Sequence, residues 1–158
     1  MKTKILIYIF CSILISTFLF KTNAQTYNMS NNIVTDCNGT IYDSGGASGV
    51  YGSNENATFQ ICPDDPDNSC VSLNFSFFNL EASFDFLYIY DGDATTGNLL
   101  GEYSATSPTT IISTNGCMTL VFDSDNGGNE DGWEATWTCI PPPVACGQEV
   151  CESTPPAN

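Results

Sequence analysis

The 158-residue sequence contains no histidine and only three basic residues. All three bases, Lys2, Lys4 and Lys21, lie within the first 21 residues, whereas all 18 Asp and Glu residues follow residue 24. The side chains of residues 25–158 therefore carry a formal charge of 0 − 18 = −18. This segment lacks the basic side chains that neutralise nucleic-acid phosphates. It also lacks the Arg and Lys that clamp smaller phosphate groups.

The missing imidazole disfavours several kinds of catalytic site. Ser-His-Asp and Cys-His arrangements need a histidine as the general base, and zinc enzymes commonly bind their metal through histidine. Carboxylates without an internal counterion need a cation from outside. Calcium is suited to this role because it takes six to eight oxygen ligands and no nitrogen. The alternative is a solvated acidic surface that aids solubility.

The first 24 residues combine a basic start, an apolar run and an end of small residues, with Thr22 and Ala24 before the expected cut. This pattern is typical of a secretory signal peptide over residues 1–24, cleaved before Gln25. A membrane anchor is the alternative, but the apolar run over residues 5–20 is shorter than the roughly 20 residues that a span needs. We therefore predict a mature chain that is secreted or at the cell surface and has no membrane span.

Seven cysteines follow the predicted signal peptide, and in an exported chain they indicate disulfides rather than metal thiolates. Their number is odd, so one thiol is free or has its partner in another chain or in further sequence. They are Cys37, Cys62, Cys70, Cys117, Cys139, Cys146 and Cys151.

Short apolar runs separated by Gly, Asn, Asp and Ser residues predict β-strands, and the mature chain has no helical pattern. In "VSLNFSFF" (71–78) the apolar side chains alternate, which places Val71, Leu73, Phe75 and Phe77 on one face. We predict an all-β fold over residues 37–139: an antiparallel β-sandwich or jelly roll with one core, stapled by disulfides. Further strands are expected at 57–62, 86–91, 99–104, 109–113, 117–123 and 133–139.

The two flanks of this domain differ from it in composition. Residues 25–36 are polar and are expected to form a loose lead-in segment. Residues 140–158 contain three prolines in a row, Pro141 to Pro143, which favour an extended spacer, and the segment is predicted to be a linker or the start of a further module.

Several sequence pieces in this order resemble a CUB domain over residues 37–139. They are Cys37 with "GTIYDSGG", then "GVYGSNENATFQIC", "FNLE", "DFLYIYDG", "LGEYS", "STNGCMTLVFDSD" and "GWEATW". The version here is most similar to copies found in modular secreted bacterial surface proteins. The resemblance implies a sandwich of two antiparallel sheets, in agreement with the strand pattern.

The resemblance also implies a disulfide between Cys37 and Cys62. A second disulfide of the family is missing, because Ser83 and Ser104 stand at its positions. We expect Cys117 and Cys139, on the last two predicted strands, to form the second bond instead. A Cys62–Cys70 bond remains an alternative, since connectivity does not follow from sequence.

Many CUB domains carry a calcium site at one end of the sandwich, and the resemblance places its ligands on Glu81, Asp85, Asp125 and the carbonyl of Asn126. Asp85 shares one strand face with two residues expected in the core, so its side chain should point inward. Burying an unpaired carboxylate there would be costly. A dication would offset the repulsion among the converging carboxylates. A solvated acidic loop is the alternative.

The opposite face of the same strand carries Phe86, Tyr88 and Tyr90. Exposed aromatic rings could stack on a sugar or anchor a protein partner, unless a loop or the lead-in segment covers them. In the family, calcium orders loops that grip a lysine of the partner, and Tyr51 matches a tyrosine near that surface.

We therefore predict a non-enzymatic, calcium-dependent extracellular module for binding or adhesion. Its partner is expected to be either an extracellular protein, recognised through a basic side chain, or a carbohydrate. The alternative is an accessory domain of a larger secreted protease or glycosidase. A glycosidase site within this chain is disfavoured, because the carboxylates come without a recognisable cleft.

Overall fold

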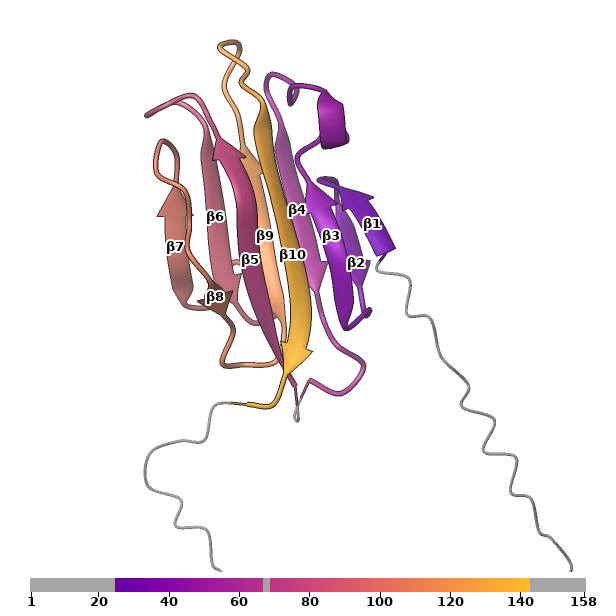
Figure 1. Cartoon of the computed structure of the whole chain (residues 1–158). Coiled ribbons are helices and arrows are strands. Elements are labelled where there is room, and N and C mark those ends of the chain that lie inside the picture. Colours follow the sequence, from indigo (N-terminus) through magenta and orange to yellow (C-terminus); the bar gives the residue numbers. More distant parts are fainter. Residues whose placement is uncertain (1–24, 67–68, 143–158) are drawn as a thin grey trace, which may run out of the picture.

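The computed structural model describes residues 25–66 and 69–142, and it confirms the predicted all-β sandwich of two sheets (Figure 1). The predicted signal peptide and most of the proline-rich segment, with Cys146 and Cys151, lie outside these residues. The first sheet has the order β1 (Gln25–Asn28), β3 (Asn38–Tyr42), β10 (Gly132–Ile140), β5 (Cys70–Asn79) and β8 (Ile111–Ile112). The second has the order β2 (Asn32–Val34), β4 (Asn56–Ile61), β9 (Met118–Asp123), β6 (Phe86–Asp91) and β7 (Leu99–Tyr103).

Helical structure in the described ranges is limited to one 3₁₀ turn, η1 (Gly46–Ser48). Nowhere in the described residues is there a helix with the length and apolar character needed to cross a membrane.

Residues 25–36 are part of the sandwich, so the expectation of a loose lead-in was wrong. They form β1 and β2, which pair in parallel with β3 and β4 at one edge of each sheet, while the other strand pairs are antiparallel. Met29 and Val34 are buried in the common core. A polar edge strand needs only backbone pairing and one or two apolar contacts, and its composition therefore resembles a loop.

The core lies between the two sheets. On β6 the predicted alternation is present, since Leu87 and Ile89 are fully buried while the aromatic residues that alternate with them are half-buried on the outer face. The largest fully buried side chains are Trp133, Trp137, Tyr51, Phe59 and Phe122.

A β-bulge interrupts the alternation predicted for β5. Glu134 pairs with Phe77 and the next residue, Ala135, pairs with Phe75, so Ser76 has no partner on β10. Beyond the extra residue, each side chain of β5 points to the opposite face of the sheet from the one that regular alternation would give it. Phe78 consequently packs against the core, and Phe77, predicted to face inward, is 45% exposed on the outer face.

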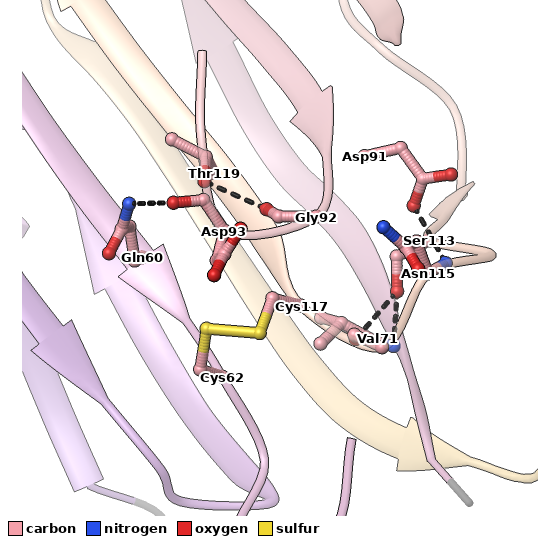
Figure 2. Close-up of a disulfide and its surroundings, with 11 residues drawn as sticks. Gln60, Cys62, Val71, Asp91, Gly92, Asp93, Ser113, Asn115, Cys117 and Thr119 are labelled. Atoms are coloured by element: carbon pink, nitrogen blue, oxygen red, sulfur yellow. Dashed lines mark hydrogen bonds between the residues drawn. A yellow bond between two sulfur atoms is a disulfide. The ribbon is translucent and has the colours of Figure 1, made fainter. Parts of the chain in front are cut away.

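The four cysteines expected in disulfides form them with a different pairing. Cys37 is bonded to Cys139, and Cys62 is bonded to Cys117 (Figure 2). The predicted pairs Cys37–Cys62 and Cys117–Cys139 were wrong, and the alternative Cys62–Cys70 bond is not formed. Cys70 is buried without a disulfide within the described part of the chain.

The strand order explains this pairing. β3 lies antiparallel to β10 in the first sheet, and β4 lies antiparallel to β9 in the second. Each bond therefore joins residues just beyond the end of a strand pair. The last two strands of the sequence, β9 and β10, belong to different sheets, so Cys117 and Cys139 are not neighbours as expected.

Candidate metal centre

Three chain connections gather at one end of the sandwich, at the top of Figure 1. They are the η1-containing connection from β3 to β4, the connection from β5 to β6, and the connection from β9 to β10. Phe86 of β6 pairs with Asp123 of β9, so the residues just outside this pair meet at the same end. The fold thereby brings Asp85 and Asp125, 40 positions apart in sequence, close together.

Three of the predicted ligands form one cluster. One carboxylate oxygen each from Glu81, Asp85 and Asp125 lies within 4.8 Å of the others. Glu81 reaches the cluster although only three residues separate it from Asp85. The intervening segment makes a tight turn, in which Ser83 has a positive φ of 70° and the Asp85 N–H donates to the Glu81 carbonyl over 3.1 Å.

Asp85 is the buried centre of this cluster, with no exposed surface. Its Oδ1 accepts a hydrogen bond of 2.8 Å from the Asp125 N–H. Its Oδ2 accepts one of 2.5 Å from the Tyr51 hydroxyl. Two donors offset part of the cost of burying the carboxylate, and they fix its orientation toward Glu81 and the Asp125 side chain.

Tyr51 is buried, with 1% of its surface exposed, so its ring does not offer the partner contact that we predicted. Its hydroxyl instead accepts a 3.0 Å hydrogen bond from the Glu81 N–H while donating to Asp85. Burial, together with the hydrogen bond to Asp85, raises the pKa of the Tyr51 hydroxyl and keeps it protonated. The side chain of Asn129 donates to the Tyr51 carbonyl, which ties the β9–β10 connection to the site. Tyr51 is a positioning residue for the cluster.

The electrostatics of the cluster are unfavourable without a cation. Desolvation raises the pKa of Glu81, and the negative charges of Asp125, Asp85 and Glu130 raise it further. Residues 25–158 contain no Lys, Arg or His that could offset these charges. A positive ion or an external basic group would therefore stabilise the ionised form.

The separation of the oxygens fits calcium. Two oxygens bound to one Ca²⁺ at 2.3–2.6 Å can be at most about 5.2 Å apart, and the limit for Mg²⁺ is about 4.2 Å. The spread of up to 4.8 Å lies inside the first limit. Asn126 is exposed in the chain beside Asp125, and the role of its carbonyl stays a prediction.

Gly128 is a part of the site that sequence reasoning missed. It has a positive φ of 74°, and a Cβ at this position would lie 1.9 Å from Oε2 of Glu81. Only glycine lets the backbone approach the carboxylate so closely. The Gly-Gly pair in "DSDNGGNEDG" was the available signal.

The predicted aromatic surface is on the outer face of the second sheet and is separate from the cluster. The rings of Phe86 and Tyr88 are nearly parallel, with centroids 5.8 Å apart. Phe86, Tyr88 and Tyr90 are all half-buried. The lead-in strands pair at the far edges of the sheets rather than lying over β6.

A disulfide-linked sandwich with carboxylates gathered at one loop end is typical of extracellular binding modules. The chain matches the model of the CUB domain over residues 30–137. It therefore belongs to the CUB domain family.

The relatives that this chain matches include cubilins and a metalloproteinase of animals, and the expected likeness to bacterial copies is not supported. The chain is 34% identical to pig cubilin over 109 residues and 32% identical to human cubilin over 120 residues. These matches cover 64% and 71% of this chain but only 3% of either cubilin. A third relative is the zinc metalloproteinase nas-39 of Caenorhabditis elegans, 33% identical over 58% of this chain and 10% of its own length.

Solved structures show the same fold. The extracellular region of zebrafish Gpr126/Adgrg6 matches with a TM-score of 0.62 and 18% identity, over 72% of this chain and 15% of that chain. The MASP-1 CUB2 domain bound to Ca²⁺ matches with a TM-score of 0.59 and 23% identity, over 69% of this chain and 98% of that chain.

Proposed function

We propose that this chain is a non-enzymatic extracellular module that binds Ca²⁺ at one end of its sandwich and uses that end to recognise a basic side chain of a protein partner. The observation that carries the proposal is the convergence of Glu81, Asp85 and Asp125 without any basic residue in the same part of the chain. A structural relative, the MASP-1 CUB2 domain, was solved with Ca²⁺ bound.

The ion would add a further link among three connections that hydrogen bonds already join. Glu81 belongs to the β5–β6 connection and Asp125 to the β9–β10 connection, while Tyr51 links both to the segment after η1. Calcium would order these loops and leave an acidic rim, which suits a basic side chain electrostatically. The module would serve adhesion or recruit partners for a larger secreted or cell-surface protein.

Calorimetry and melting experiments test the metal site. The protein should bind Ca²⁺ and melt at higher temperature with Ca²⁺ than with a chelator. At a hundredfold excess over the dissociation constant, the stabilisation should be about 2.7 kcal/mol. If calorimetry detects no binding and the melting temperatures agree, the calcium proposal fails.

The outer-face aromatic residues favour a second contact surface. Phe86, Tyr88 and Tyr90 could stack on a sugar ring or anchor a protein. Screening against immobilised glycans, with Tyr88→Ala as the variant, separates these cases. Loss of glycan binding in the variant would support a sugar as the ligand of this surface. If the parent protein binds no glycan, the sugar hypothesis is rejected.

An accessory role in a secreted protease is the second candidate function, because one relative is a zinc metalloproteinase. The sequence of the complete gene shows whether this chain is part of a secreted protease. A protease domain in the same polypeptide would favour the accessory role.

A further inference from the structure

A pocket of about 320 Å³ opens on the outer face of the first sheet, next to η1. Its walls include Tyr42, Val50, Phe77, Asp131 and Glu134. None of the three clustered carboxylates lines it. The volume is at the lower end of the roughly 300–1,000 Å³ found for ligand pockets. It therefore suits a single long side chain.

The β5 bulge produces one wall of this pocket. Because Ser76 is unpaired, Phe77 faces outward and pairs across the strands with Glu134. Glu134 in turn pairs with Tyr42 of β3. The three side chains form an outward-facing row in which one carboxylate lies between two aromatic residues. Bulges commonly redirect a side chain next to a functional site.

The apolar part of the pocket is open to solvent. Phe77 is 45% exposed, and Val50, in the connection after η1, is 55% exposed. An apolar surface of this kind beside a carboxylate suits the hydrocarbon stem and the flat face of a cationic side chain.

The acidic groups of the pocket have different environments. Asp43 is buried, and its carboxylate accepts hydrogen bonds from the N–H groups of Gly45 (2.7 Å) and Trp133 (3.1 Å). Asp43 therefore maintains the fold. Glu134 and Asp131 have no such donor to their carboxylates among the described residues, and the chain has no base after residue 21. Residues 25–158 therefore supply no basic side chain to neutralise either carboxylate.

We propose that this pocket binds an arginine side chain of an extracellular protein partner without the need for calcium. A guanidinium group is planar and can stack on Phe77 or Tyr42. It can also donate two parallel hydrogen bonds to the Glu134 carboxylate. An ammonium group offers neither the plane nor the paired donors, so arginine fits better than lysine.

The pocket and the carboxylate cluster share their supporting segments. Val50 of the pocket precedes Tyr51 of the cluster, and Asp131 lies in the same connection as Asp125. A partner with two basic residues can therefore engage both sites from one end of the sandwich.

An NMR titration in the presence of a chelator tests the pocket separately from the calcium proposal. The probe is N-acetyl-arginine amide, compared with the lysine amide and with the neutral citrulline amide. The main reporters are the backbone N–H groups of Glu134 and of residues 46–50, all of which line the pocket. The indole N–H of Trp137, which donates to the Asp36 carbonyl over 2.8 Å, is the internal control.

The arginine probe should shift the amides of Glu134 and of residues 46–50 in a saturable way, and should leave the Trp137 indole unchanged. Lysine should bind at least threefold more weakly, and citrulline should give no shift. Shifts spread evenly over the acidic surface, or equal shifts with citrulline, would overturn the proposal.

Two variants and a matched control complete the test. Glu134→Gln and Phe77→Ala should each weaken arginine binding at least threefold, and both change partly exposed side chains, so the proteins should fold. Glu102→Gln is the control, because Glu102 pairs with Tyr88 on the outer face of the other sheet, which places an acid beside an aromatic residue outside this pocket. If Glu102→Gln weakens binding as much as Glu134→Gln, the arginine pocket is refuted.

Discussion

The Tyr51 hydroxyl donates a 2.5 Å hydrogen bond to Oδ2 of Asp85, 34 positions away in sequence. The same hydroxyl accepts a hydrogen bond from the Glu81 N–H. One buried phenol thus fixes the positions of two of the three clustered acids.

Tyr51→Phe removes both hydrogen bonds while keeping the ring that packs against Phe122. We expect the free energy of unfolding to fall by about 1–3 kcal/mol, because the buried Asp85 carboxylate loses a donor. Urea unfolding in the presence of a chelator measures this change. Tyr88→Phe, on the outer face, is the control and should stay within about 0.5 kcal/mol of the parent. Equal effects of the two substitutions would contradict the positioning role of Tyr51.

Gly128→Ala should weaken Ca²⁺ binding, because the new methyl group would collide with the Glu81 carboxylate and the positive φ would be strained. We expect at least a tenfold rise in the calcium dissociation constant, measured by calorimetry. The adjacent Gly127→Ala is a matched control, since no atom lies within 4 Å of a Cβ there. The proposed position of Glu81 at the ion would be wrong if both variants bind Ca²⁺ like the parent.

Asp85→Asn should raise the calcium dissociation constant tenfold or more, equivalent to about 1.4 kcal/mol. Without calcium, the substitution relieves repulsion with Glu81 and Asp125. Asp93→Asn is the control, because Asp93 is an exposed residue near the Cys62–Cys117 bond at the opposite end of the sandwich (Figure 2). It should leave calcium affinity unchanged in a calorimetric titration. If Asp93→Asn weakens calcium binding and Asp85→Asn does not, the ion binds at the end of the sandwich opposite to the proposed site.

The raised pKa of Glu81 predicts opposite pH responses with and without calcium. In the metal-free protein, the folded state holds the Glu81 proton more tightly than the unfolded chain. The contribution of Glu81 to the free energy of unfolding therefore falls as the pH rises from the unfolded to the folded pKa. With calcium the ligand must be deprotonated, so the affinity should decrease as the pH falls through the same interval.

A carbon-13 NMR titration of the Glu81 carboxyl group checks this prediction. The midpoint should lie above the ordinary value in chelator and should move down when Ca²⁺ is added. An unchanged midpoint would show that Glu81 does not contact the ion.

Peptide mapping of the unreduced protein should recover Cys37 linked to Cys139 and Cys62 linked to Cys117. The first bond joins residues 102 positions apart, and replacing both of its cysteines by serine should cost about 2–5 kcal/mol. Urea unfolding measures the loss. Recovery of a Cys37–Cys62 peptide would contradict the strand pairing described here.

The sequence by itself determined the strand content and the sandwich, and its resemblance to the CUB family identified the three clustered acids. The strand content depends on local patterns. Alternating residues such as Leu87 and Ile89 identify a strand with one buried face. The absence of bases after residue 21 is a property of composition, and it leaves the acids without an internal counterion whatever the fold.

Only the tertiary structure decided the disulfide pairing, the course of residues 25–36 and the roles of Tyr51 and Phe77. Each depends on which strands become neighbours, and many strand orders are compatible with one pattern of short apolar runs. Cys37 meets Cys139 because β3 pairs with β10. Phe77 faces solvent because one unpaired residue in β5 reverses the alternation, and local periodicity cannot reveal a bulge whose partner strand lies more than 50 residues away.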